Sequence, residues 1–340
     1  MSEQPLVSII TPTYKHEKYI LDCIRSVQAQ QYTNWELLII NDGSPDNTEE
    51  LVLKEIKNDP RIYYFKQQNI GIQRLGESYN KAFNLSKGEF IAILEGDDVW
   101  TSNKLKRQIK AFQEQPEAVL AWGSANSVNE NLSEEIKLHP STDSKHTQYY
   151  TNSPIPSILN LLFIENYIPA LTILIRRNAL EKIGGFIQSH NLPLVDLPTI
   201  MALSKLGTFI FDPELLGSWR IYPTQVTKMY PVEIIKGRYA LSLNQYDSLS
   251  DEIRKSISIS KKDIDSYFKF ILLQAYARSG RYRLIRKEYQ KARADYKKAI
   301  FFSGKLQFMW RLRALIGYVF SIFRLNVEGI ARFMGRNTYS

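Results

Sequence analysis

The chain has 340 residues, 44% of them hydrophobic, which is enough to bury a large core and excludes a disordered protein. Its single cysteine, Cys23, excludes an internal disulfide and a cysteine-based zinc site. Cys23 lies in a helical pattern, where we interpret it as a small packing residue. The N-terminus lacks a basic segment ahead of a long apolar run, so we expect no signal peptide and a cytoplasmic location.

The formal net charge of +9 is unevenly distributed along the chain. Residues 231–340 hold 22 Lys and Arg against 9 Asp and Glu, a balance of +13, which leaves −4 for residues 1–230. The pattern also becomes all helical from about residue 231. We therefore expect two domains, an α/β domain at 1–230 and a basic helical region at 231–340.

Residues 1–100 alternate short apolar runs with helical spacing. Such alternation implies parallel strands joined by helical crossovers, and so an α/β fold with a Rossmann-like, doubly wound mixed sheet. Ligands bind such sheets at the carboxyl ends of the strands. The predicted strands lie at 6–10, 35–40, 62–65 and 90–94, and the predicted helices near 20–27, 51–56 and 76–85.

The stretch FIAILEGDDVW, residues 90–100, runs from a predicted buried strand directly into three carboxylates, Glu95, Asp97 and Asp98. Like charges this close repel one another unless a cation or hydrogen-bond donors compensate them. Their hard oxygen atoms suit Mg²⁺ or Mn²⁺. The alternative interpretation is an acidic turn, because Asp and Gly are common turn residues.

The pattern after Trp100 is less regular. Residues 126–160 are polar and predict a long loop or irregular insertion. We expect a helix over 192–207, with Asp196 near its start, and strands around a Pro-containing turn over 208–228. The other predicted elements are a helix at 103–113, strands at 118–124 and 171–177, and a helix that ends at Gly184.

The basic region is predicted to contain an antiparallel helix pair over 263–300, broken at Ser279 and Gly280. A further helix is expected over 306–323, where Arg311 and Arg313 interrupt an apolar stretch too short to span a membrane. This composition is typical of an interfacial amphipathic helix on an anionic membrane surface. The alternative is a helix packed on the core of the protein itself.

Several motifs together are specific enough to indicate a family. The chain resembles the family two glycosyltransferases of GT-A fold, of the bacterial surface-polysaccharide type, over about residues 5–228. That resemblance implies an inverting enzyme that uses a nucleotide-sugar donor. It is carried by the motifs TPTYKHEKY (11–19), NDGSPDNT (41–48), NIG (69–71), GEFIAILEGDD (88–98) and IGGF (183–186).

The resemblance also implies roles for residues of the donor site. Thr11, Pro12, Tyr14 and Asp42 match positions that hold the nucleobase and ribose, and Arg74 follows NIG as a further candidate nucleotide contact. Asp97 and Asp98 match the D-x-D position of the family. Asp98 is expected to bind the metal directly, and Asp97 to contact the metal or the ribose. The family often has Asp where this chain has Glu95.

The expected chemistry needs a metal and a general base. A divalent cation neutralises the charge that develops on the leaving diphosphate. A carboxylate takes the proton of the acceptor hydroxyl, and by resemblance this base is Asp196, also the only acidic residue between Glu181 and Asp212. Val195 stands where the family has Glu. The alternative for Asp196 is a first-turn aspartate stabilised by the helix dipole.

Tyr222 stands where the family has a histidine that meets the metal or the diphosphate. A phenol is a poor metal ligand near neutral pH, because its unperturbed pKa is about 10. Arg220 and Lys228 are candidates to supply positive charge to the diphosphate instead, or are surface residues. The two aspartates therefore do not by themselves establish that the activity depends on a metal.

Three other classes of protein share some of these sequence features. A sugar nucleotidyltransferase needs a Gly-rich loop after the first strand, and TPTYKHEKY has no Gly. A nucleic-acid-binding protein needs a basic stripe with base-stacking aromatics. The positive charge here is confined to a helical tail beside an apolar segment, so we expect no nucleic acid partner. A catalytically silent relative stays open, because positions 95, 195 and 222 depart from the family.

We expect transfer from a nucleotide-diphosphate sugar to a hydroxyl of a saccharide. We expect this saccharide to be lipid-linked, because a membrane-docked enzyme would lie beside such an acceptor. This transfer would be a step in cell-surface polysaccharide biosynthesis. The expected cofactor is Mn²⁺ or Mg²⁺. The basic tail is expected to hold the protein on the cytosolic face of the plasma (inner) membrane.

Overall fold

The computed structural model describes residues 4–141, 146–189, 192–222, 225, 231–303 and 307–325. The chain divides into two compact units. The first comprises residues 1–225 and 250–258, and the second comprises 226–249 and 259–340. The first unit therefore includes a short segment, 250–258, that follows the expected domain boundary at residue 230.

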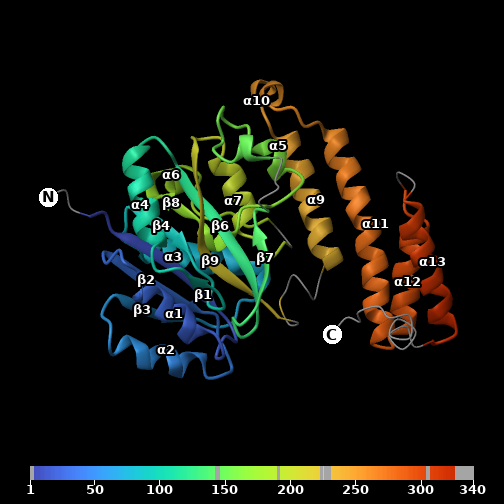
Figure 1. Cartoon of the computed structure of the whole chain (residues 1–340), viewed down its shortest axis with the longest axis horizontal. Helices are drawn as coiled ribbons and strands as arrows, with labels where there is room; N and C mark the ends of the chain where they lie inside the picture. The colour runs from blue at the N-terminus through green and yellow to red at the C-terminus, as the bar shows by residue number, and fades with distance from the viewer. Residues whose placement is uncertain are drawn as a thin grey trace. The chain divides into compact units, whose positions relative to one another are not determined.

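The first unit is built on one mixed sheet with the strand order β3-β2-β1-β4-β8-β6-β9-β5, and β7 pairs with β6 (Figure 1). Strands β1 to β4 run parallel, whereas β8 is antiparallel to both of its neighbours, β4 and β6. The strands are β1 (Val7–Thr13), β2 (Trp35–Asn41), β3 (Ile62–Lys66), β4 (Phe90–Ile93), β5 (Val99–Trp100), β6 (Leu120–Asn129), β7 (Glu135–His139), β8 (Leu174–Arg176) and β9 (Phe209–Ile221).

Helices connect these strands and cover the sheet. The parallel strands β1, β2, β3 and β4 are joined by helical crossovers, as the alternating pattern predicts. The helices of the first unit are α1 (Ile20–Gln28), α2 (Thr48–Ile56), α3 (Leu75–Leu85), α4 (Lys104–Glu114), α5 (Leu159–Leu162), α6 (Arg177–Lys182), α7 (Asp196–Leu203) and α10 (Asp251–Ser256), with short 3-10 turns η1 (Ile72–Arg74), η2 (Thr147–Tyr149) and η3 (Ala170–Thr172).

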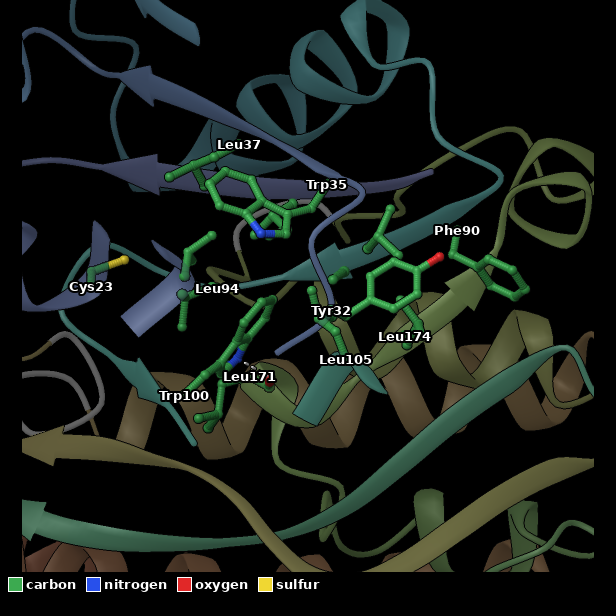
Figure 2. Close-up of a cluster of buried hydrophobic side chains, with 14 of the residues drawn as sticks. Cys23, Tyr32, Trp35, Leu37, Phe90, Leu94, Trp100, Leu105, Leu171 and Leu174 are labelled. Carbon is green, nitrogen blue, oxygen red and sulfur yellow. Dashed lines mark hydrogen bonds between the residues drawn. The ribbon is translucent and has the colours of Figure 1, made fainter. Parts of the chain in front are cut away.

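The core of the first unit explains why α1 forms where it does. Ile20, Cys23, Ile24 and Val27 recur on one face of α1 and are all fully buried. They join a cluster that includes side chains of β1, β2, β4 and α4. Cys23 lies in this cluster (Figure 2), which confirms its packing role.

Residues 126–160 are more regular than their polar sequence predicts. β6 continues to Asn129, and β7 pairs with it antiparallel while β9 pairs with it on the other side. The polar side chains stay hydrogen-bonded inside this ladder: the Ser127 hydroxyl donates to the carbonyl of Lys137 at 3.3 Å. The prediction of a long loop or irregular insertion is therefore wrong for 126–129 and 135–139, where backbone pairing overrides weak strand propensity. Residues 140–141 and 146–158 are irregular apart from η2, as predicted.

A single strand, β9, replaces the strands and Pro-containing turn predicted over 208–228. Its register against β6 shifts, since Gly123 pairs with Asp212 and the next residue, Ser124, pairs with Leu215. The intervening Pro213 and Glu214 therefore bulge out of the ladder. A bulge tolerates proline because no N–H is needed there. Residues 223, 224 and 226–228 of this prediction lie outside the described residues.

Two predicted elements are shorter than expected. The helix expected over 192–207 is α7, and Asp196 is its first residue. The strand expected over 171–177 is only β8, because the 3-10 turn η3 precedes it.

The second unit is helical, as expected. It contains α9 (Pro231–Asp247), α11 (Lys261–Ile285), α12 (Tyr289–Ile300) and α13 (Phe308–Ile322) (Figure 1). A core of small and aromatic side chains, including Ala292, Tyr296 and Ala314, joins these helices. Within the described ranges, no helix has both the length and the apolar content needed to cross a bilayer.

The predicted helix break at Ser279 and Gly280 is wrong, because α11 runs through both residues without interruption. Gly280 is required there by packing: a Cβ atom at this position would lie 2.7 Å from a ring carbon of Tyr296 in α12. The chain turns after α11 instead, where Lys287 adopts a left-handed φ of 62°.

Candidate active site

The topology brings three loops to one edge of the sheet. β1 lies between β2 and β4 in a parallel arrangement, with Thr13 opposite Asn41 and Ile10 opposite Ile93. Parallel strands end at the same edge, so the loops after all three strands meet there. These loops carry Tyr14, Asp42 and the acidic segment from Glu95 to Asp98.

Gly96 lets the acidic loop approach the loop after β1. A Cβ atom at Gly96 would lie 2.7 Å from both the His16 Nδ1 atom and the Thr13 Oγ1 atom. Those two atoms are 3.2 Å apart, in hydrogen-bond contact. Any larger residue at position 96 would therefore push the acidic loop away from the loop after β1.

Asp42 organises the loop that contains NIG. Its carboxylate accepts hydrogen bonds from the backbone N–H groups of Ile70 at 2.9 Å and Gly71 at 3.1 Å. The Gln67 amide donates to the same carboxylate at 2.9 Å. These donors fix the orientation of the carboxylate and tie the loop after β2 to the loop after β3.

The other candidate nucleotide contacts differ in exposure. Thr11 and Pro12 are buried, and among the described residues the Thr11 hydroxyl has no hydrogen-bond partner. Tyr14 is 40% exposed, with the Lys15 ammonium 5.2 Å from its ring centre. Arg74 is exposed and forms a two-pronged ion pair with Glu77, with both N–O distances at 2.6 Å.

The acidic cluster carries unusual protonation equilibria. Asp97 and Asp98 are only 7% and 9% exposed. Burial, and then the charges of Asp97 and Glu95, hold the pKa of Asp98 well above its usual range. Burial and the charge of Asp97 raise the pKa of Glu95 to about 7. Burial first, and then repulsion between the carboxylates, therefore favour the protonated forms of Glu95 and Asp98.

Neutral groups hold these carboxylates in place. The Tyr222 hydroxyl donates to Asp97 Oδ2 at 2.8 Å, and the Tyr79 hydroxyl donates to Glu95 Oε1 at 2.8 Å. The backbone N–H of Arg220 donates to Asp98 Oδ1 at 3.3 Å. Burial, followed by the charge and hydrogen bond of Asp97, raises the pKa of Tyr222, so the phenol stays a proton donor.

Arg220 is placed differently from the sequence prediction. Its side chain is 1% exposed, and all three guanidinium nitrogens are hydrogen-bonded. They donate to Asp22 Oδ2 at 2.6 Å, to the carbonyl of Glu130 at 3.0 Å and to the carbonyl of Asp97. This buried placement suits a residue that positions the acidic loop rather than one that contacts a diphosphate. Lys228 lies outside the described residues.

Asp196 lies near the acidic cluster. As the first residue of α7 it is partly buried, and the Asn166 amide donates to its Oδ2 atom at 2.7 Å. Its charge contributes to the raised pKa values of both Glu95 and Tyr79. Asp196 therefore lies within electrostatic range of Glu95, the first carboxylate of the acidic segment.

A cleft of about 400 Å³ lies beside Asn166. Its lining is mixed, with polar side chains next to aromatic ones, and the rings of His139 and Trp219 lie 4.4 Å apart, centre to centre. Asn166 therefore belongs both to the cleft and to the hydrogen bond that holds Asp196. Small-molecule sites combine such apolar and aromatic lining with a few polar groups.

The residues of the acidic cluster fit a divalent cation. In the described part of the chain, no group of three or more His, Cys, Asp or Glu side chains could hold a metal by itself. Mg²⁺ sites that use substrate phosphates need only one or two carboxylates. Asp97 and Asp98 provide that number, and a bound cation would favour the charged form of Asp98, which burial disfavours here.

Sequence reasoning missed three side chains that build this site: Tyr79, Asn166 and Asp22. Tyr79 follows the apolar pattern of α3 and carries no motif. Asp22 lies 198 residues from Arg220 in the sequence, so no local signal links the two.

Residues 8–184, more than half of the chain, match glycosyl transferase family 2. The chain is similar to the putative teichuronic acid biosynthesis glycosyltransferase TuaG of Bacillus subtilis, with 27% identity over 66% of this chain and 82% of that protein. It is also similar to the UDP-Glc:alpha-D-GlcNAc-diphosphoundecaprenol beta-1,3-glucosyltransferase WfgD of Escherichia coli. There the identity is 37% over 37% of this chain and 48% of that protein.

Two solved structures share the fold. TarS 1–349 of S. aureus in complex with UDP is 16% identical, with a TM-score of 0.56 over 98% of this chain and 93% of that one. The mannosyltransferase PcManGT of Pyrobaculum calidifontis, in complex with GDP-Man and Mn²⁺, is 14% identical, with a TM-score of 0.54 over 99% of this chain and 89% of that one. These likenesses confirm the predicted fold class, a GT-A type mixed sheet followed by a helical region.

Proposed function

The chain belongs to glycosyl transferase family 2, and on this premise we propose that it transfers a sugar, with inversion, from a nucleotide-diphosphate donor to a saccharide hydroxyl. One observation carries the proposal. The loops after β2 and β4 carry Asp42 and the buried pair Asp97 and Asp98 to the same edge of the sheet, and the charge of Asp196 reaches Glu95 in the same acidic segment.

The donor would lie across the loops after β1, β2 and β4. In this proposal the exposed Tyr14 meets the nucleobase, the buried Thr11 and Pro12 form the floor beneath it, and Asp42 meets the ribose. Arg74 lies close enough to Asp42 for their charges to interact, so it stands at the rim of the same site. Complexes of TarS with UDP and UDP-GlcNAc support a nucleotide-sugar donor.

A divalent cation, Mn²⁺ or Mg²⁺, would be held by Asp98 and Asp97, and when bound it supplies positive charge to the leaving diphosphate. Arg220 and Tyr222 keep the acidic loop in the conformation that presents these carboxylates. The Mn²⁺ complex of PcManGT supports this assignment.

Asp196 would accept the proton of the attacking hydroxyl. The hydrogen bond from Asn166 orients the carboxylate, and the cleft beside Asn166 is our proposed site for the acceptor. The similarity to TuaG and WfgD supports a role in cell-surface polysaccharide biosynthesis. The acceptor named for WfgD supports a saccharide joined to a lipid through a diphosphate.

The first test is thermal unfolding with UDP, GDP, dTDP and CDP, each with and without Mn²⁺. A nucleotide at about 100 times its Kd stabilises the folded state by about 2.7 kcal/mol. We expect one nucleotide to act, with a Mn²⁺-dependent shift that Asp98→Ala removes. A shift that Asp98→Ala leaves unchanged would refute the metal assignment, and the absence of any shift would refute the donor site.

Asp196→Asn is the matched variant for catalysis. It keeps the size of the side chain but cannot accept a proton, so the nucleotide shift should persist while sugar transfer is lost. Retained transfer would remove Asp196 from the role of base.

A catalytically silent nucleotide-sugar binder is the second candidate. The hydrogen bond from Tyr222 to Asp97 favours it, because this phenol occupies an oxygen atom of a proposed metal ligand. Such a protein would show the shift in thermal unfolding with nucleotide, but it would release no nucleoside diphosphate from any donor.

A further inference from the structure

Helix α13 has two different faces. Ala314, Gly317 and Ser321 are buried on one side, where a Cβ atom at Gly317 would lie only 2.2 Å from the Tyr296 ring. This close approach fixes the rotation of the helix about its axis. The apolar stripe, defined as the eight apolar residues on its other side and just past its end, is 36% to 69% exposed and consists of Phe308, Met309, Leu312, Leu315, Ile316, Val319, Ile322 and Phe323.

The stripe is continuous along the helix. Its members recur every three or four residues, so their side chains lie one above another on a single helix face. Phe301, which follows α12, is 80% exposed and adds a further aromatic ring to the second unit's exposed apolar surface. Apolar surface gathered in this way marks an interaction site, whereas singly exposed apolar residues need no explanation.

Positive charge flanks the stripe. At 100° per residue, Arg311 and Arg313 fall on opposite borders of it. Arg313 is exposed, and its guanidinium lies 5.0 Å from the centre of the Trp310 ring. Arg311 donates to the carbonyls of Ile300 and Phe302, so it also anchors the helix.

The sequence around the stripe contains no compensating negative charge. From Tyr296 to Val327 the chain has no Asp or Glu, and its Lys and Arg residues there are Lys297, Lys298, Lys305, Arg311, Arg313 and Arg324. The partner of the stripe must therefore be apolar at its centre and anionic at its borders. A second copy of the same stripe would bring like charges together, which disfavours self-association.

We infer that the apolar stripe docks on an anionic bilayer surface, with α13 lying in the plane of the interface. The apolar side chains would enter the boundary with the acyl chains, and the flanking cations would meet lipid phosphates. A helix of 15 residues lying flat covers about 22 Å of the surface. This inference does not depend on the proposed catalytic function, although it would bring the enzyme to a lipid-linked acceptor.

The test is co-sedimentation of the full chain with vesicles of phosphatidylcholine alone and of phosphatidylcholine mixed with phosphatidylglycerol. We expect binding to the mixed vesicles and at least tenfold weaker binding to the neutral ones. The double variant Leu315→Glu/Val319→Glu should abolish binding, because both positions are exposed and the change places two carboxylates in the stripe.

A matched control is Leu53→Glu/Leu206→Glu. These leucines of the first unit are 43% and 42% exposed, and the substitution changes the net charge by the same amount. Its binding should stay within about threefold of the wild type, because both added charges lie outside the stripe and their effect falls off within a Debye length. Arg313→Gln should weaken binding about fivefold, the effect of one cation near an anionic surface. Circular dichroism would verify that each variant is folded.

Three results would overturn the inference: no binding by the wild type, equal loss in both double variants, or full binding by Leu315→Glu/Val319→Glu. Sedimentation velocity without lipid tests whether a second copy of the chain covers the stripe instead. A wild-type dimer that the stripe variant converts to a monomer, together with no lipid binding, would assign the stripe to a second copy of the chain.

Discussion

Burial of the Glu95 carboxyl makes the stability of the folded protein depend on pH. This carboxyl is held by Tyr79 and lies beside Asp97, and burial is the largest cause of its raised pKa. In the unfolded chain the proton leaves near pH 4.5, whereas in the folded protein it leaves near pH 7. Between these values the folded state binds more protons, so stability falls as pH rises.

We therefore predict that Glu95→Gln stabilises the protein above pH 7 by up to about 3 kcal/mol and has little effect below pH 4.5. Glutamine keeps an oxygen atom for the Tyr79 hydroxyl but cannot ionise. Urea unfolding across this pH range measures the difference. An exposed control, Glu114→Gln, should show no comparable dependence on pH, and a pH-independent effect of Glu95→Gln would contradict the prediction.

Other site residues could be named from sequence only in part. The carboxylates at 95, 97 and 98 and Asp196 are visible in motifs, because catalytic groups occur in short patterns. Their partners are not, because a tyrosine in a helix or an asparagine in a loop has no distinctive pattern. The buried position of Arg220 could not be predicted from the sequence either, because it depends on contacts with Asp22 and Glu130, which are distant in sequence.

At the scale of elements, close packing decides where helices continue. Gly280 and Gly317, on different helices, both face the ring of Tyr296. The sequence treats a glycine within a helical pattern as a candidate break, but here each one makes room for a neighbouring helix. The polar C-terminal part of β6 is a similar case, because its pairing with β7 and β9 outweighs its local preference.

Gly317→Ala should destabilise the second unit by about 1–3 kcal/mol, because the added Cβ atom overpacks against Tyr296. Leu315→Ala, on the exposed face of the same helix, should cost less than about 0.5 kcal/mol. Thermal unfolding compares the two variants. Adding Tyr296→Leu to Gly317→Ala should recover part of the loss if the ring is the cause.

At the scale of the whole molecule, the two compact units divide the proposed tasks. All the candidate donor-site residues lie in the first unit, and the apolar stripe lies in the second. Each unit has its own buried hydrophobic cluster, so each has a source of independent stability.

Calorimetry of the full chain should therefore resolve two unfolding transitions. The nucleotide that binds should raise only one of them, because ligand stabilises only the unit that holds it. Gly317→Ala should lower only the other. A single transition that responds to both changes would show that the units unfold together.

The sequence by itself determined the alternation of strands and helices, the edge of the sheet that carries the acidic residues, and the family. These features are local, because strand and helix periodicity and short motifs are written in neighbouring residues. Only the tertiary structure decided the burial of Asp98 and Arg220, the hydrogen bond between Asn166 and Asp196, and which face of α13 stays exposed. Each of these depends on residues that are distant in sequence and meet only when the core is packed, as Arg220 and Asp22 do across 198 residues.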